Sequence, residues 1–218
     1  MTNAPLLDGR PCRIANLFCI GRNFVAHAAE LGNTVEPEPL VFLKPTSALL
    51  LEGAPIVLPG YSGDVHHECE LVVLIGKGGD HIAEADALSH VAGYGIGLDL
   101  TARDVQNEAK AKGHPWTKAK GFRGAACVSA LVPAARVADP QALTFSLKVN
   151  GEMRQLGDTS LMLFGVARLI AELSERYGLS DGDLIYTGTP AGVAALRPGD
   201  TLELTLTGLV SARWEVAA

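Results

Sequence analysis

The hydrophobic positions of this chain form short runs that glycine and proline interrupt. Short apolar runs bounded by such residues predict β-strands, and residues 201–207 also alternate as a half-buried strand does. The Asn150-Gly151 pair after one run is a strong signal for a hairpin turn. The predicted strands cover residues 40–43, 54–58, 70–75, 93–100, 145–149, 183–186 and 201–207.

Helical periodicity is less frequent. Residues 161–177 repeat apolar side chains at helical spacing up to Gly178, and residues 24–31 and 83–91 are shorter candidates. A further helix is expected to open at Thr101, in a capping box that has aspartate in the place of glutamate, and to end at Gly113. With no repeat or linker, the pattern predicts one compact, strand-rich α+β domain.

Composition and charge exclude several classes of protein. Of 218 residues, 48% are hydrophobic and 19% are charged, with a formal net charge of −6. A negative surface disfavours sequence-independent binding of nucleic acid and docking on a membrane with anionic lipids. We find no signal-peptide pattern and no run near the ~20 apolar residues of a membrane span. Four cysteines without a metal-binding motif suggest reduced thiols in a soluble, cytoplasmic protein.

Glu68 and Glu70 form the most informative acidic pair, at the start of the apolar run 70–75. In a strand, side chains two residues apart point to the same face and stand about 6.6 Å apart along the chain. Both carboxylates could therefore converge on one ion. Burying an unpaired carboxylate costs several kcal/mol, so such a pair requires a partner. Two solvated glutamates at a strand entrance are the alternative interpretation.

Asp99 adds a third carboxylate, at the end of an apolar, glycine-rich run and just before the helix expected at Thr101. Three oxygen ligands without cysteine favour a hard cation, Mg²⁺ or Mn²⁺, over zinc. A zinc site would recruit His66 or His67, and strand parity allows only His66 to join the glutamates. For either histidine, hydrogen bonding to a ligand is the role we favour.

An ordered set of further motifs runs almost from end to end. It includes CIGRNF (19–24), FLKP (42–45), HHECEL (66–71), GYGIGLDLTARDVQ (93–106), VNGE (149–152) and TGTP (187–190). In this order the motifs resemble the fumarylacetoacetate hydrolase superfamily, and within it the short acylpyruvase-type members. The resemblance covers residues 14–215, so residues 1–218 would be a single catalytic domain with an N-terminal extension, 1–13.

The resemblance implies a mixed β-roll or β-sandwich fold of the kind found in the C-terminal domain of that superfamily, and a homodimer. It implies a bound Mg²⁺ or Mn²⁺ and a lid that orders over the ligand. The matching positions are, for the metal, Glu68, Glu70 and Asp99; for catalysis, His27, Glu30 and Lys120; and for substrate binding, Arg22, Gln106 and Thr189.

The residues themselves agree with several of these assignments. His27 and Glu30 are three positions apart on a short predicted helix, so they can meet, and a carboxylate beside a histidine suits a general base. An incidental surface pair is the alternative. Strand alternation would place Lys118 and Lys120 on one face, and only the family match singles out Lys120. Lys44, inside an apolar run, is expected to be structural or near the site.

These expectations favour a metal-dependent hydrolase that cleaves the C3–C4 bond of an acylpyruvate, for example fumarylpyruvate, to pyruvate and a carboxylic acid. The same enolate chemistry would serve an oxaloacetate decarboxylase or tautomerase, or a 2-hydroxyhepta-2,4-diene-1,7-dioate isomerase. A non-catalytic, metal-bound sensor of 2-oxo acids is a more distant alternative. In every case the expected partner is a small 2-oxo acid.

Overall fold

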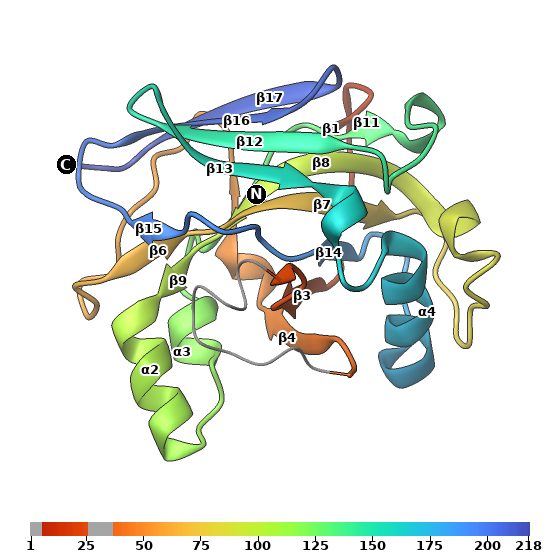
Figure 1. The fold of residues 1–218 in the computed structure, drawn as a ribbon, viewed down its shortest axis with the longest axis horizontal. Coiled ribbons are helices and arrows are strands. Elements are labelled where there is room, and N and C mark those ends of the chain that lie inside the picture. Colours follow the sequence, from red (N-terminus) through yellow and green to blue (C-terminus); the bar gives the residue numbers. More distant parts are fainter. Residues whose placement is uncertain (1–5, 26–36) are drawn as a thin grey trace.

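An eight-stranded sheet forms the centre of the molecule (Figure 1). The computed structural model describes residues 6–25 and 37–218. The sheet contains β3 (Leu17–Gly21), β4 (Leu40–Lys44), β5 (Leu49–Leu51), β7 (Cys69–Ile75), β8 (Val91–Asp99), β10 (Ala126–Val128), β11 (Val132–Pro133) and β14 (Leu184–Tyr186). Across it the order is β4-β3-β14-β7-β8-β10-β5, and β11 also pairs with β8.

The two edges of this sheet approach each other. Strand β4 is one edge and β5 is the other, yet only residues 45–48 connect them. That connection spans at most about 18 Å, whereas the edges of a flat sheet of this order would lie about 29 Å apart. The sheet therefore curls into a half-barrel, and its concave side is where the candidate site is found.

A four-stranded antiparallel sheet lies over β7 and β8 (Figure 1). It contains β12 (Thr144–Val149), β13 (Glu152–Asp158), β16 (Thr201–Leu206) and β17 (Val210–Glu215), in the order β13-β12-β16-β17. Burial alternates along β16, so its three leucines are buried while Glu203 is exposed. This sheet thus contributes one apolar face to the core. Asn150 and Gly151, with φ of 53° and 81°, form the predicted hairpin turn between β12 and β13.

Two smaller sheets complete the strands. One contains β6 (Val65–His67), β9 (Thr101–Ala102) and β15 (Ala194–Ala195); the other contains β1 (Leu6–Leu7) and β2 (Arg10–Pro11). The predicted strand at 54–58 is wrong, because only Ile56 pairs there, in an isolated bridge to Val216.

Strands β7 and β8 are buried on both faces, and glycine makes this possible. Every residue of β7 is buried. In β8, the alternate residues Gly93, Gly95 and Gly97 all face the segment 127–132. A Cβ added to Gly97 would lie 2.4 Å from the Cys127 carbonyl oxygen, so a side chain there would push that segment away. The glycines of β8 are therefore explained by the close approach of the backbone of residues 127–132 to this strand.

The helices lie at two ends of the curled sheet (Figure 1). Helices α2 (Arg103–Lys112) and α3 (Thr117–Lys120) pack together at one end, and α4 (Val166–Tyr177) lies at the other. Helix α2 ends at Gly113 in the left-handed conformation, as expected. The predicted capping box is wrong, because Ala102 precedes the helix and Thr101 belongs to β9.

The remaining helix predictions have mixed outcomes. Helix α4 ends at Gly178 as predicted but begins at Val166, after a separate short 3-10 turn at Thr159–Leu161. Residues 83–91 form turns and a short 3-10 helix, Ala87–His90, in place of an α-helix. The candidate helix at 24–31 lies largely outside the described residues. In the part of the chain that the structure describes, every helix is too short or too polar to span a membrane. The strand-rich α+β fold class is confirmed.

Candidate active site

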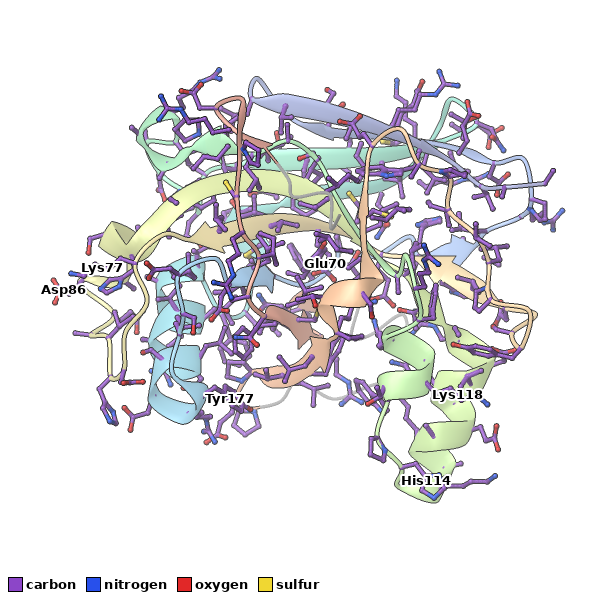
Figure 2. The ribbon with its side chains drawn as sticks, turned by 180° about the vertical axis from the view of Figure 1, so that it is seen from behind. Glu70, Lys77, Asp86, His114, Lys118 and Tyr177 are labelled. Atoms are coloured by element: carbon purple, nitrogen blue, oxygen red, sulfur yellow. The ribbon has the colours of Figure 1, made fainter. Side chains whose placement is uncertain are left out.

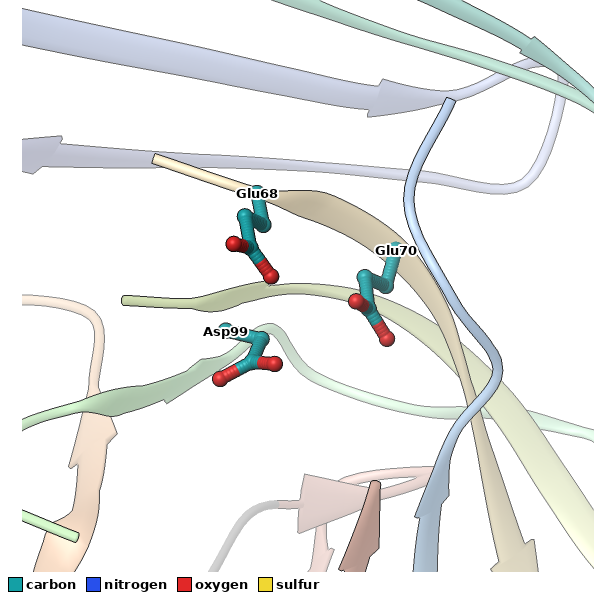
Figure 3. Close-up of side chains that lie close together, drawn as sticks. All are labelled: Glu68, Glu70 and Asp99. Carbon is teal, nitrogen blue, oxygen red and sulfur yellow. The ribbon is translucent and has the colours of Figure 1, made fainter. Parts of the chain in front are cut away.

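Three carboxylates meet where β7 and β8 lie side by side (Figure 3). Glu68 occupies the break between β6 and β7, Glu70 is the second residue of β7, and Asp99 ends β8. The Asp99 amide donates to the Glu68 carbonyl over 2.8 Å, which fixes the register of the two strands at this point. One candidate ligand oxygen from each residue lies within 4.8 Å of the others, and all three residues are buried.

Two buried lysines neutralise part of this negative charge. The Lys120 ammonium lies 2.8 Å from Glu68 Oε2 and 2.6 Å from Asp99 Oδ2. The Lys44 ammonium lies 2.6 Å from Asp99 Oδ1. Lys44 also donates to the carbonyl oxygens of Leu100, Lys120 and Ala125 over 2.6–2.9 Å. One ammonium thus holds Asp99 and the backbone of Lys120 in fixed positions.

Glu70 has less compensation than its neighbours. Its Oε2 accepts the Gly188 amide over 2.8 Å, but within the described part of the chain no lysine or arginine forms an ion pair with it. Burial, and then the negative charges of Asp99 and Glu68, raise its pKa well above the usual value. A cation placed among the three carboxylates would stabilise the ionised form of Glu70. The oxygen-only donor set therefore fits Mg²⁺ or Mn²⁺.

Glu68 is held by donors from α2 and β9. Arg103 Nη2 lies 2.5 Å from its Oε1, and Thr101 donates its hydroxyl to the same oxygen over 2.9 Å. Arg103 also donates to Gln106 Oε1 over 2.7 Å. The Thr101 hydroxyl, expected from the sequence to cap a helix, therefore helps to fix Glu68 in the site.

A cavity opens onto these groups on the concave side of the sheet. Its volume is about 30 Å³, and apolar side chains of β3 and β4 form part of its wall. The lining residues are Ile20, Gly21, Arg22, Leu40, Phe42, Glu68, Glu70, Arg103, Gln106, Lys110, Trp116, Lys120 and Thr189. The Lys120 ammonium lies 4.8 Å from the centre of the Phe42 ring, which shields it from bulk water on that side.

A buried glutamine supports the wall that carries Thr189. Thr189 donates its hydroxyl to the Cys69 carbonyl over 2.9 Å and accepts from Gln155 Nε2 over 2.8 Å. Gln155 Oε1 also accepts the Cys69 amide and lies 3.0 Å from His67 Nδ1. Gln155 comes from β13, so the second sheet takes part in shaping the cavity.

Arg22 enters the cavity from a constrained turn at the end of β3. Its φ is 60°, a value uncommon for residues other than glycine and costly unless the surroundings enforce it. The next residue, Asn23, is buried and donates to the carbonyl oxygens of Thr187 and Phe164. These bonds hold the turn against the segment that carries Gly188, whose amide meets Glu70.

The structure brings seven of the nine site residues predicted from the sequence to one place. Six of them line the cavity: Arg22, Glu68, Glu70, Gln106, Lys120 and Thr189. Asp99 lies directly behind, and one of its carboxylate oxygens is within 4.8 Å of a ligand oxygen from each of Glu68 and Glu70. His27 and Glu30 lie outside the described residues, and their roles stay predictions.

Other sequence interpretations need correction. Lys118 and Lys120 do not share a face, because they lie in a helix and not a strand: Lys120 is buried, whereas Lys118 is exposed over the Tyr61 ring. Figure 2 shows Lys118 at the surface of the helical pair and Glu70 in the centre. Hydrogen bonding to a metal ligand is the favoured role for His66 and His67, but His66 bonds to Asp64 and His67 to Gln155. As expected, neither histidine belongs to the carboxylate cluster of the described residues.

Four residues that line or support the cavity were not assigned a role from the sequence. Lys44 was singled out without a role, and Arg103, Lys110 and Gln155 were not identified. For α2 a signal did exist, because Arg103, Gln106 and Lys110 follow the three- and four-residue spacing of one helical face. Lys44 and Gln155 act through backbone groups from distant segments, which no local pattern reveals.

Known proteins share this fold and much of this sequence. The mitochondrial oxaloacetate tautomerase FAHD1 of Rattus norvegicus is 49% identical over 201 residues, 92% of this chain and 91% of the relative. The same enzyme of Arabidopsis thaliana is 44% identical over 200 residues, 92% of this chain and 90% of the relative. Fumarylpyruvate hydrolase from Pseudomonas aeruginosa, crystallised with Mn²⁺ and pyruvate, superimposes with a TM-score of 0.93 at 37% identity, covering 98% of this chain and 96% of that one.

The chain also matches the fumarylacetoacetate (FAA) hydrolase C-terminal family over residues 16–217, nearly its whole length. The family match, the relatives and the shared fold agree with one another. The chain therefore belongs to the fumarylacetoacetate hydrolase family, as its motifs predicted.

Proposed function

We propose that this chain is a divalent-metal-dependent enzyme that interconverts the keto and enol forms of oxaloacetate. The sequence alone favoured acylpyruvate hydrolysis, with oxaloacetate chemistry as the alternative. The similarity to oxaloacetate tautomerases, at 44–49% identity over 92% of the chain, supports the alternative better. The observation that carries the proposal is the buried Lys120 ammonium beside the cluster of Glu68, Glu70 and Asp99.

Glu68, Glu70 and Asp99 are the residues that would hold the metal, Mg²⁺ or Mn²⁺. When bound, the metal supplies positive charge that polarises the 2-oxo acid end of the substrate and stabilises the enolate. The two candidate metals use the same oxygen donors, so we propose either.

Lys120 supplies the protein's own positive charge to this reaction. Removing a proton from C3 of a 2-oxo acid places negative charge on the C2 oxygen. A fixed ammonium in a cavity shielded by Phe42 stabilises such charge far better than water does. Lys120 is already held in place by Glu68 and Asp99, so it needs no reorganisation as the charge develops.

Other residues would bind and orient the acid. We propose that Arg22, Gln106 and Thr189 bind its oxygen atoms, and that Ile20 and Phe42 exclude water from the reacting carbons. We retain His27 and Glu30 as the pair that moves the proton at C3. We also propose that the chain acts as one catalytic domain and as a homodimer.

The experiment is to add oxaloacetate enol to the Mg²⁺-loaded protein and to follow its ultraviolet absorbance. We expect enol loss to exceed the spontaneous rate, to return to that rate on chelation, and to release neither CO₂ nor pyruvate above background. Release of CO₂ in step with enol loss would replace tautomerisation by decarboxylation. No acceleration on any 2-oxo acid, with binding retained, would favour a sensor.

Acylpyruvate hydrolysis is the second candidate. It is supported by the structural likeness to the Pseudomonas aeruginosa fumarylpyruvate hydrolase, with a TM-score of 0.93. Enolate stabilisation by Lys120 would serve C3–C4 cleavage equally well, with His27 and Glu30 activating the water. The two candidates separate on one panel, because hydrolysis of fumarylpyruvate releases pyruvate and tautomerisation of oxaloacetate does not; lactate dehydrogenase and NADH detect the pyruvate.

A further inference from the structure

One face of α2 lines the cavity from the metal side outward. Arg103, Gln106 and Lys110 are separated by three and four residues, so they follow each other along one side of the helix. All three line the cavity. Arg103 and Gln106 are buried, whereas Lys110 remains in contact with solvent. Lys110 therefore occupies the rim, about two helical turns beyond Arg103, which contacts Glu68.

Lys110 contacts an aromatic ring, whereas Arg103 and Lys120, the other cations of α2 and α3 that line the cavity, contact carboxylates. Arg103 is paired with Glu68, and Lys120 with Glu68 and Asp99. Among the described residues, Lys110 forms no salt bridge; its ammonium instead lies 5.3 Å from the centre of the Trp116 ring. A cation over an aromatic face is held in position while its N–H groups remain available to a ligand.

Among the described residues that line the cavity, cationic side chains outnumber carboxylates. Four cationic side chains line the cavity, Arg22, Arg103, Lys110 and Lys120, against the two carboxylates Glu68 and Glu70. Partial burial, and then the positive charges of Arg103 and Arg22, lower the pKa of the Lys110 ammonium. An anion bound at the rim would relieve this repulsion, and a metal bound deeper in the cavity would increase the need for one.

We propose that Lys110 is a specificity-determining residue that binds the distal carboxylate of a dicarboxylic 2-oxo acid, while the 2-oxo acid end faces Glu70 and Lys120. This inference rests on the proposed function and adds the residue that would select a short dicarboxylate such as oxaloacetate over a monocarboxylate. Trp116 is its positioning residue, because its ring holds the ammonium at the rim and packs in turn on Phe42, with ring centres 5.8 Å apart.

The test measures binding, so that it does not depend on turnover. Malate and lactate are stable probes that share a 2-hydroxy acid end and differ in the second carboxylate. Their dissociation constants for the Mg²⁺-loaded protein are measured by calorimetry for the wild type and three variants: Lys110→Gln, Lys110→Arg and Lys118→Gln. Lys118→Gln is the matched control, because it removes the same charge from an exposed lysine that stacks on Tyr61 outside the cavity.

We expect Lys110→Gln to weaken malate binding about tenfold, the loss of roughly one charge-assisted hydrogen bond, and lactate binding less than twofold. Lys110→Arg should stay within about threefold of the wild type for malate, since it retains the charge. Lys118→Gln should change neither constant.

Three results would overturn the assignment: malate binding unchanged in Lys110→Gln, malate and lactate weakened equally, or an equal loss in Lys118→Gln. The first removes the contact, the second indicates a general disturbance of the cavity, and the third indicates a long-range effect of net charge. If the malate preference depends on Lys110 while no variant accelerates loss of oxaloacetate enol, the tautomerase proposal fails and the dicarboxylate site stands.

Discussion

The inner wall of the cavity and its rim use charge in different ways. The inner wall consists of the lining residues Glu68, Glu70 and Lys120 together with Lys44 and Asp99 behind them. These residues are buried, and Lys44 and Lys120 form salt bridges with Asp99 and Glu68. The rim, defined by Arg22, Lys110 and Trp116, is partly open to solvent, and the Lys110 ammonium lies over the Trp116 ring without a salt bridge among the described residues. This contrast suggests that the inner wall determines the reaction and the rim determines which acid reacts. Three substitutions test this division of roles.

The largest effect is expected from Glu70→Gln. The amide keeps an oxygen for the Gly188 N–H but removes the negative charge that the inner wall offers to a metal. We expect kcat/KM to fall at least about a thousandfold, because several kcal/mol of charge stabilisation are lost. Steady-state kinetics across a Mg²⁺ titration would measure this.

The control for that experiment is Glu203→Gln, which removes the same charge from an exposed position of β16. It should leave kcat/KM unchanged. If Glu70→Gln were fully active and its melting temperature still rose with Mg²⁺ as in the wild type, Glu70 would not be a metal ligand.

A smaller but still severe loss is expected from Lys120→Met. The methionine fills a similar volume but cannot stabilise charge on the C2 oxygen, and removal of one such donor costs about 10²–10³ in kcat. The loss should appear in kcat more than in KM, because the ammonium acts on charge that develops during the reaction. Lys118→Met, on the exposed side of the same helix, should keep wild-type kinetics; a kcat near wild type for Lys120→Met would assign that lysine to packing.

The third prediction concerns Lys44→Met and is mainly an effect on metal binding. Loss of the ammonium frees Asp99 Oδ1 and the carbonyl oxygens of Leu100, Lys120 and Ala125. Changing a group that orients a metal ligand typically weakens metal affinity about ten- to a hundredfold. Breaking a buried ion pair costs up to about 3–5 kcal/mol of stability, and the cost here should be smaller because Lys120 still pairs with Asp99.

Calorimetric titration with Mn²⁺ and urea unfolding would measure the two effects of Lys44→Met separately. Lys44→Arg keeps a positive charge, so it should recover part of the Mn²⁺ affinity even though the larger head fits the pocket poorly. A drop in stability with unchanged Mn²⁺ affinity would restrict Lys44 to a structural role and would break the link between the inner wall and the metal.

The sequence predicted the carboxylates better than it predicted their supports. Glu68 and Glu70 were found because strand parity is a local rule, and Asp99 because a lone acid at the end of an apolar run is conspicuous. Lys44 escaped assignment since its partners are carbonyl oxygens from three distant segments. Thr101 was misassigned because a threonine before a helix caps in isolation, whereas here the carboxylate of Glu68 competes for its hydroxyl.

The predicted elements show the same division between local and distant causes. Turns that need glycine or asparagine were located correctly, as at Asn150 and Gly178, because backbone sterics act over a few residues. The curl of the sheet was not predicted, since it depends on the pairing order of strands that are far apart in the chain.

Lys44 lies on the edge strand β4 and reaches Asp99 on β8, yet four strand spacings separate the two along the sheet. Laid flat, that separation is about 19 Å, well beyond the length of a lysine side chain. The Lys44–Asp99 ion pair therefore depends on the curvature of the sheet and can form only when the sheet is curled into the half-barrel. A substitution in β3 or β14 that flattened the sheet would therefore separate Lys44 from Asp99. The carboxylate cluster would lose this ion pair although none of its acidic residues had been changed.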